Sequence, residues 1–205
     1  FLTWWPFVKW TDAGLVFKPW TYIDDKGMPQ GVRLLGVLAR IALCYFFGAI
    51  IIYYLKPRGA LVTGMIFLLV YWLLCFLLGD PADPYSMTGW FGNDVDRSVL
   101  GIAHMYKGEG IPFDPEGIMS TMPAIVQVIF GYLIGDYIRK KELNYEMLSG
   151  LFVIGVAMLV TGYCWDKVFP INKKIWTSSY VIYTTGLASL TIGTMIYLIE
   201  FKKVR

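Results

Sequence analysis

The chain has 205 residues, of which 57% are hydrophobic, 17% aromatic and only 16% charged, and its formal net charge is +3. This composition leaves too little polar surface to cover a compact water-soluble domain, so it favours a protein whose solvent is the lipid bilayer. The positive residues fall in short clusters beside apolar runs, which is typical of membrane topology signals and argues against nucleic acid as a partner.

Residues 1–33 precede the first apolar run and carry tryptophans among prolines and charged residues. Tryptophan is enriched where a membrane protein meets the lipid headgroups. We therefore expect 1–33 to be an outer, interfacial, aromatic-rich segment, and no part of it predicts a sheet. The tryptophans concerned are Trp4, Trp5, Trp10 and Trp20.

Five apolar stretches follow, each close to the roughly 20 residues that a helix needs to cross the hydrocarbon core. They predict an all-α polytopic membrane protein with one membrane domain: two helices in 34–79, a long outer loop over 80–117 and three helices in 118–205. The loop is far longer than a connection between two helices requires, so we expect it to fold as a cap. The stretches are 34–55, 60–79, 118–138, 147–164 and 176–199, with a tight turn expected at Lys56-Pro57-Arg58-Gly59.

Short basic loops mark the cytoplasmic side of a membrane protein, because moving positive residues across the bilayer is disfavoured. The basic clusters at 56–58, 139–141 and 202–205 alternate with acidic or mixed loops, which are expected to face outward. Lys173 and Lys174 are the exception, a basic pair on the expected outer side. The compact loops and the lack of an N-glycosylation sequon favour a multi-pass protein of the bacterial inner membrane.

Arg40 lies about six residues, or roughly 9 Å, into the first predicted helix, with Arg33 and Gly36 on the same helix face. An arginine at this depth usually faces a protein or water-filled interior. Arg40 therefore either snorkels outward or pairs with a structural carboxylate, or it supplies a fixed positive charge that binds an anionic group of a ligand.

Asp114 and Glu116 stand directly before the third predicted helix, with Pro115 between them. Asp114 suits the N-cap, Pro115 the first helical position and Glu116 the positive end of the helix dipole, so capping alone explains these residues. The alternative is catalysis, since a carboxylate beside a membrane-embedded cavity is placed for general acid or base work.

His104 is the single histidine and lies in the expected outer loop. Histidine transfers protons near neutral pH, which makes His104 a third catalytic candidate. No partner for it is visible in the sequence, so a surface or structural role explains it as well.

The segment before the last predicted helix combines polar and aromatic side chains. Asn172 or Thr177 suits the cap of that helix, and Trp176 suits an interfacial anchor. Lys173 and Lys174 oppose the helix dipole, a conflict that an anionic partner resolves. Asn172, Lys173, Lys174 and Trp176 are therefore candidates for substrate or cofactor binding.

Two further patterns predict structure rather than chemistry. Gly131 and Gly135 form a GxxxG motif, which is typical of close helix packing. Cys44, Cys75 and Cys164 are widely spaced and stand near no histidine cluster, so the sequence predicts neither a metal site nor a disulfide framework.

The predicted topology brings the starts of the first, third and last helices to the outer face. Arg40, Asp114, Glu116, Asn172 and Lys173 would then share one side of the membrane. Carboxylates and basic residues beside Trp, Ser and Thr suit a sugar or an acyl-carrier group, but this pattern alone does not identify the reaction.

Three segments in this order resemble the heparan-α-glucosaminide N-acetyltransferase family and its bacterial relatives, which are sometimes labelled N-acetylglucosamine-related transporters. The segments are GVLARIALCY at 36–45, FDPEGIMSTMPAI at 113–125 and DKVFPINKKIWTSSYV at 166–181. The resemblance covers most of 31–190. It makes Arg40, the stretch 114–117 and the stretch 172–176 motif positions without assigning a role to each residue.

The resemblance implies an acyltransferase that takes acetyl-CoA from the cytoplasm and acetylates the amino group of a terminal glucosamine on the far side of the membrane. The implied partners are the lipid bilayer and an amino sugar or glycan, with a homo-oligomer as a possible assembly. The family's opening helices, its outer-loop catalytic histidine and its last helices have no counterpart, and His104 does not match that histidine. Together with the start at Phe1, this indicates an excerpt from the middle of a longer chain.

Two other classes of function fit the same residues. A sugar transporter would use Arg40 and the outer carboxylates to bind and release an unchanged substrate. A structural or assembly subunit would bind neither acetyl-CoA nor sugar.

Overall fold

The computed structural model describes residues 7–11, 14–23, 27 and 29–203. Trp4 and Trp5 of the expected aromatic segment lie outside the described residues. Trp10 and Trp20 lie inside them, and their side chains are exposed.

Four helices in the described part of the chain are long and apolar enough to cross a membrane. They make the chain an all-α polytopic membrane protein, as the apolar stretches predict. The helices are α1 (Val37–Leu78), α3 (Ile118–Lys140), α4 (Tyr145–Trp165) and α5 (Ser178–Ile196), the last of which continues into the π-helical segment η3 (Tyr197–Phe201).

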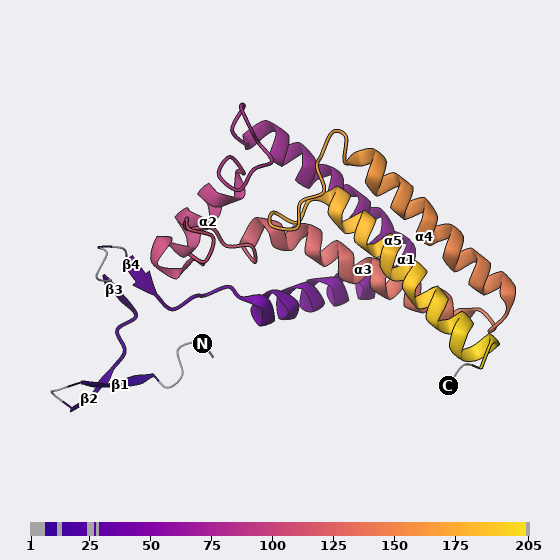
Figure 1. The fold of residues 1–205 in the computed structure, drawn as a ribbon, viewed down its shortest axis with the longest axis horizontal. Helices are drawn as coiled ribbons and strands as arrows, with labels where there is room; N and C mark the ends of the chain where they lie inside the picture. Colours follow the sequence, from indigo (N-terminus) through magenta and orange to yellow (C-terminus); the bar gives the residue numbers. More distant parts are fainter. Residues whose placement is uncertain (1–6, 12–13, 24–26, 28, 204–205) are drawn as a thin grey trace.

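Helix α1 is 42 residues long and contains one break, which lies where the sequence predicts a turn. Lys56 has φ 59° and ψ 174°, outside the helical region, and Pro57 follows it. Proline disfavours helical geometry in the residue before it and has no N–H to donate. The break divides α1 into two halves that fold back on each other (Figure 1). These halves correspond to the expected helices 34–55 and 60–79.

Both halves of α1 pack against α3. Cys44 of the first half and Ala60 of the second share a buried cluster with Ala124, Ile125 and Ile129 of α3. Because α1 and α3 both begin at the same end of the bundle, their N-terminal residues lie close together, as the contacts described below show.

Helices α4 and α5 lie side by side (Figure 1), and glycines allow their close approach. A Cβ on Gly186 would come within 2.8 Å of the Gly155 carbonyl oxygen, and a Cβ on Gly162 would meet Tyr183 at the same distance. At Gly131 and Gly135 a Cβ would meet nothing within 4 Å. The expected close packing at this GxxxG motif is therefore wrong for the described residues, and the glycine contacts lie between α4 and α5 instead.

The long connection between α1 and α3 folds over the end of the bundle. It contains helix α2 (Gly92–Leu100) and the 3₁₀ turn η2 (Ile102–His104). Its Trp90, Phe91 and Phe113 are buried against Tyr71 of α1 and Phe169 of the α4–α5 loop. Burial of large aromatic side chains is a strong source of packing energy, and here it holds the connection against the helices.

The N-terminal segment forms two small antiparallel hairpins, which the sequence did not predict. Strand β1 (Val8–Thr11) pairs with β2 (Gly14–Phe17), and β3 (Thr21–Ile23) pairs with β4 (Pro29–Gly31). The strands have three or four residues each, too few for a clear alternating pattern. Figure 1 shows them apart from the helical bundle, at the end where α1 begins.

Candidate functional site

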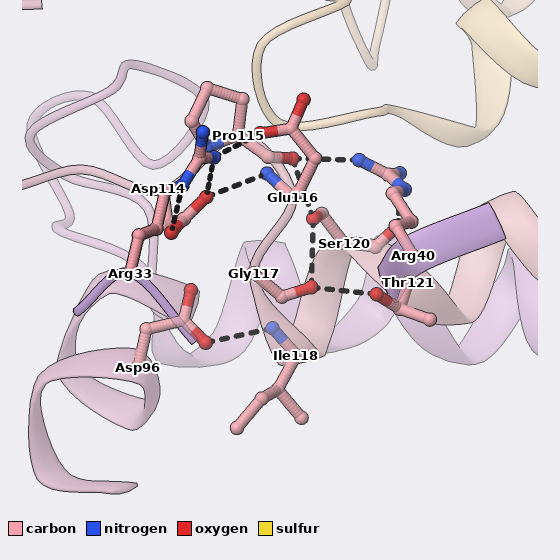
Figure 2. Close-up of polar contacts among 10 residues, drawn as sticks. All are labelled: Arg33, Arg40, Asp96, Asp114, Pro115, Glu116, Gly117, Ile118, Ser120 and Thr121. Atoms are coloured by element: carbon pink, nitrogen blue, oxygen red, sulfur yellow. Dashed lines mark hydrogen bonds and ion pairs between the residues drawn. The ribbon is translucent and has the colours of Figure 1, made fainter. Parts of the chain in front are cut away.

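An arginine and two carboxylates meet where the loop before α3 passes the start of α1. Arg33 donates from Nε and Nη2 to the two oxygens of Asp114, at 3.2 and 2.5 Å, and from Nη2 to Glu116 (Figure 2). Asp114 is fully buried. Burial opposes the charge of Arg33, but its hydrogen bonds and attraction to Asp114 and Glu116 raise its pKa above the ordinary value. The three side chains therefore form one charged network.

The two carboxylates differ in how many of their oxygens are already hydrogen-bonded. Both oxygens of Asp114 are engaged by Arg33, and one of them also accepts the backbone N–H of Glu116 at 3.1 Å. The Glu116 side chain is 20% exposed, and only its Oε2 is engaged in the contacts drawn in Figure 2. Glu116 is thus the carboxylate that remains available to a ligand.

Helix α3 begins three residues later than capping by Asp114 would require. Its N-cap is Gly117, which offers no side chain, and Ile118 is the first helical residue. The cap comes instead from α2, since Oδ1 of Asp96 accepts the Ile118 N–H at 2.9 Å (Figure 2). The expected roles of Asp114 as N-cap and Pro115 as first helical residue are therefore wrong.

Asp96 is buried, and its second oxygen, Oδ2, has no hydrogen-bond partner. A Cβ on Gly117 would stand 1.9 Å from this oxygen, so only glycine fits the turn between Glu116 and α3. Burial raises the pKa of Asp96 from 3.8 to about 6, against the opposing effect of the Ile118 hydrogen bond. Asp96 therefore fixes the turn that presents Glu116.

The raised pKa of Asp96 makes stability depend on pH. Between about pH 4 and 6 the folded chain keeps a proton that the unfolded chain has released, so stability falls as pH rises through this window and levels off above it. A shift of roughly two units corresponds to about 3 kcal/mol at about 1.4 kcal/mol per unit. In Asp96→Asn, which keeps an oxygen acceptor for Ile118, we expect the thermal midpoint in detergent to lose this dependence on pH.

A neighbouring aspartate provides the control for this measurement. Asp94 lies on the same helix, and its side chain is 85% exposed. Asp94→Asn is expected to keep the pH dependence of the unmodified protein. Equal pH profiles for Asp96→Asn and Asp94→Asn would contradict the assignment of the effect to Asp96.

Arg40 is 6% exposed and lies in the first turn of α1. Its Nη1 donates to the Pro115 carbonyl at 2.7 Å and its Nη2 to the Ser120 carbonyl at 2.8 Å (Figure 2). Its Nε has no hydrogen-bond partner, and no carboxylate forms an ion pair with it within the described residues. Arg40 therefore brings a buried positive charge to the start of α3 without a carboxylate in ion-pair contact, although Glu116 is near enough to attract it.

Trp176 covers this charge from the segment before α5. The Arg40 guanidinium lies 4.0 Å from the centre of the Trp176 ring, a cation–π contact. The indole Nε1–H donates to Oε1 of Gln127 at 3.1 Å. Trp176 has φ 55°, a left-handed conformation that costs about 1–3 kcal/mol in a bulky residue and persists only where the surroundings enforce it. This backbone conformation accompanies the placement of the indole ring over the Arg40 guanidinium.

A groove runs between the first half of α1 and α3, and we call it the α1–α3 groove. Its volume is about 1000 Å³. Arg40, Glu116 and Trp176 line one end, and apolar side chains of both helices line most of the remainder. The other lining residues are Val37, Ile41, Cys44, Tyr45, Ala49, Ile52, Tyr53, Ala124, Gln127, Val128, Gly131 and Tyr132.

The remaining binding candidates before α5 take part in local contacts. Asn172 donates to the Tyr85 carbonyl at 3.2 Å and accepts the Lys174 N–H at 2.9 Å. Lys174 forms an ion pair of 2.5 Å with Glu109, which lies in the long connection between α1 and α3. Lys173 is exposed. None of Asn172, Lys173 and Lys174 lines the α1–α3 groove, and their predicted binding roles stay predictions.

His104 contacts the N-terminal segment rather than the groove. Its Nδ1 lies 2.7 Å from the Val32 carbonyl oxygen, which it meets as a donor, and its ring packs against Trp20 with centroids 5.3 Å apart. These contacts tie η2 to the chain that leads into α1. The geometry therefore gives His104 a structural partner, and its catalytic role stays a prediction.

The structure thus gathers Arg40, Glu116 and Trp176 at one end of the groove, with Asp114 behind Glu116. Sequence reasoning missed Arg33, Asp96 and Gln127 as members of this arrangement. Gln127 carried a usable signal, a polar residue in the middle of an apolar stretch.

The chain is similar to two curated proteins named heparan-alpha-glucosaminide N-acetyltransferase. It is 25% identical to the human protein in an alignment 222 positions long, which covers 83% of this chain and 34% of that protein. It is 26% identical to the mouse protein over 119 residues, which cover 51% of this chain and 18% of that protein. No protein-family model matches the chain. The resemblance seen in the three sequence segments is confirmed, and the chain spans about a third of the length of the human relative.

Proposed function

We propose that this chain is the central part of a membrane-embedded acetyltransferase, which transfers acetyl from acetyl-CoA to the amino group of a glucosamine-type sugar on the non-cytoplasmic side. The observation that supports this most is Glu116, a partly exposed carboxylate held by Arg33 at the end of a groove that also contains Arg40. The likeness to proteins named N-acetyltransferases supports the reaction class. The compact loops favour the bacterial inner membrane as its location.

Acetyl transfer to an amine needs a group that accepts a proton. The amine nitrogen attacks the thioester carbonyl carbon, a C–N bond forms, the C–S bond breaks and the thiolate leaves, while the amine loses a proton. Glu116 is the best-placed acceptor, because the oxygens of Asp114 are both held by Arg33. The proton then passes from Glu116 to the thiolate.

The positive charges near Glu116 have separate tasks in this proposal. Arg33 fixes the orientation of the Glu116 carboxylate through one oxygen. Arg40, which has no carboxylate partner among the described residues, attracts an anionic part of a substrate. Lys173, on the exposed segment before α5, would meet anionic groups that approach from outside.

The test uses the full-length parent protein in detergent, supplied with isotope-labelled acetyl-CoA and glucosamine, and mass analysis of the sugar. Labelled N-acetylglucosamine in protein-dependent amounts is the expected result. Uptake of unchanged sugar into proteoliposomes without an acetylated product would establish a transporter instead. Binding of neither acetyl-CoA nor sugar would leave a structural subunit.

A further inference from the structure

The α1–α3 groove extends far beyond the polar residues at its end. Its lining follows α1 from Val37 to Tyr53, which are about 24 Å apart along the helix axis. On α3 it reaches Gly131 and Tyr132. The groove volume of about 1000 Å³ equals the upper end of the range for sites of drug-sized ligands, about 300–1,000 Å³. A single amino sugar therefore fills only a small part of it.

The long part of the groove suits hydrocarbon. It is lined by side chains such as Ile41, Ile52 and Val128 and lies between two helices that are apolar enough to span a membrane. Apart from the hydroxyls of Tyr45, Tyr53 and Tyr132, a polar ligand placed there would find few hydrogen-bond partners, and each polar group left unpaired would cost several kcal/mol. An acyl or isoprenoid chain loses nothing, because it leaves one apolar environment for another.

The polar end of the groove suits a ligand that carries an anionic group near Arg40 and an amino group near Glu116. Arg40 is more than nine-tenths buried, its Nε lacks a hydrogen-bond partner, and its charge is opposed by no carboxylate ion pair in the described residues. Glu116 lines the same end and is the available carboxylate. A phosphate beside Arg40 and an amino group beside Glu116 would complement both charges.

We propose that the acceptor is an amino sugar carried on a membrane lipid, with its hydrocarbon tail in the α1–α3 groove, its phosphate at Arg40 and its amino group at Glu116. This rests on the proposed acetyl transfer. The groove is charged at the expected outer surface and apolar toward the membrane interior. Such a lipid has its charged headgroup and its hydrocarbon tail in the same arrangement. In the proposed topology, the phosphates of a cytoplasmic acyl donor approach from the opposite end.

Two glycines of α3 offer a matched pair of variants. A Cβ on Gly131 or on Gly135 meets nothing within 4 Å, so either position has room for a first side-chain carbon, and we choose leucine for both. Gly131 lines the groove at the end away from Arg40, whereas Gly135 does not line it. Gly131→Leu therefore fills the tail site and leaves the polar end intact, and Gly135→Leu controls for the change of residue.

The experiment compares free glucosamine 1-phosphate with its isoprenoid ester as acceptors for the full-length protein in nanodiscs. We expect kcat/KM for the ester to exceed that for the free sugar phosphate by at least about tenfold, since the tail holds the acceptor in the bilayer beside the groove and so raises its effective concentration at the polar end. This preference is expected to fall about tenfold in Gly131→Leu and to persist in Gly135→Leu. Equal use of both acceptors, or equal effects of the two variants, would overturn the proposal.

A binding measurement separates the lipid site from the transferase reaction. Native mass spectrometry with an isoprenoid phosphate that lacks the sugar is expected to show binding to the unmodified protein and to Gly135→Leu, with a loss of about tenfold in Gly131→Leu. Binding of this pattern without any acetylated product would retain the lipid site and reject acetyl transfer. Transfer to free sugar phosphate without such binding would retain the enzyme and reject the lipid site.

Discussion

Replacing Arg33 by methionine is expected to destabilise the folded protein by about 3–5 kcal/mol, because the substitution leaves a buried carboxylate without its cation. Asp114 is fully buried and receives two hydrogen bonds from Arg33. Methionine retains much of the length of arginine and none of its charge. The free energy of unfolding of the full-length protein, measured with an anionic denaturing detergent, checks this expectation.

Two comparisons test the physical reason for that loss. In the double variant Arg33→Met, Asp114→Asn the buried charge is gone, so most of the lost stability is expected to return. At the exposed pair of Lys174 and Glu109, Lys174→Met is expected to cost less than about 1 kcal/mol. A double variant as unstable as Arg33→Met alone would show that packing, rather than the unpaired charge, causes the effect.

The membrane-spanning helices were predictable because their signal is local. Each depends on about 20 apolar residues in sequence, and α3 begins at Ile118, as the apolar stretch predicts. The turn near Lys56 was also predictable, since Pro57 and Gly59 lie together between two apolar runs. The helical segments therefore required no knowledge of contacts between distant residues.

The cap of α3 was not predictable, because it comes from a different element. In sequence, Asp114 suits the cap of a helix that begins at Pro115, but the helix begins at Ile118, and Asp114 binds Arg33 and the Glu116 N–H instead. Asp96 lies 22 residues before Ile118 in sequence and supplies the acceptor from α2. A sequence pattern considers neighbours along the chain, so it cannot identify an acceptor that a distant element supplies.

The environment of Arg40 was partly predictable. Its depth in an apolar run indicates an interior position, and the structure buries it. Sequence reasoning left a structural carboxylate as one alternative, but the structure supplies two carbonyl oxygens and the face of Trp176. The expected helix face shared with Arg33 is wrong, because α1 begins at Val37 and Arg33 precedes it. Only the fold shows that Arg33 and Arg40 approach Glu116 from different sides.

Replacing Glu116 by glutamine is expected to lower kcat for acetyl transfer by roughly 10²–10⁴-fold, the usual contribution of a general base. Glutamine has nearly the same shape, and its oxygen can still accept from Arg33 in place of Oε2. It cannot accept a proton from the attacking amine. We therefore expect a large change in kcat with little change in thermal midpoint, measured on the full-length protein with labelled acetyl-CoA.

Glu109→Gln is the matched control. Glu109 lies in the long connection between α1 and α3, pairs with Lys174 and does not line the α1–α3 groove. Its kcat is expected to equal that of the unmodified protein. If kcat falls in Glu116→Gln while KM stays within about threefold, the carboxylate acts on the reacting amine rather than on binding. A well-folded Glu116→Gln protein that transfers acetyl at the full rate would remove Glu116 from the reaction. That result would not make Asp114 the proton acceptor, because Arg33 holds both of its oxygens.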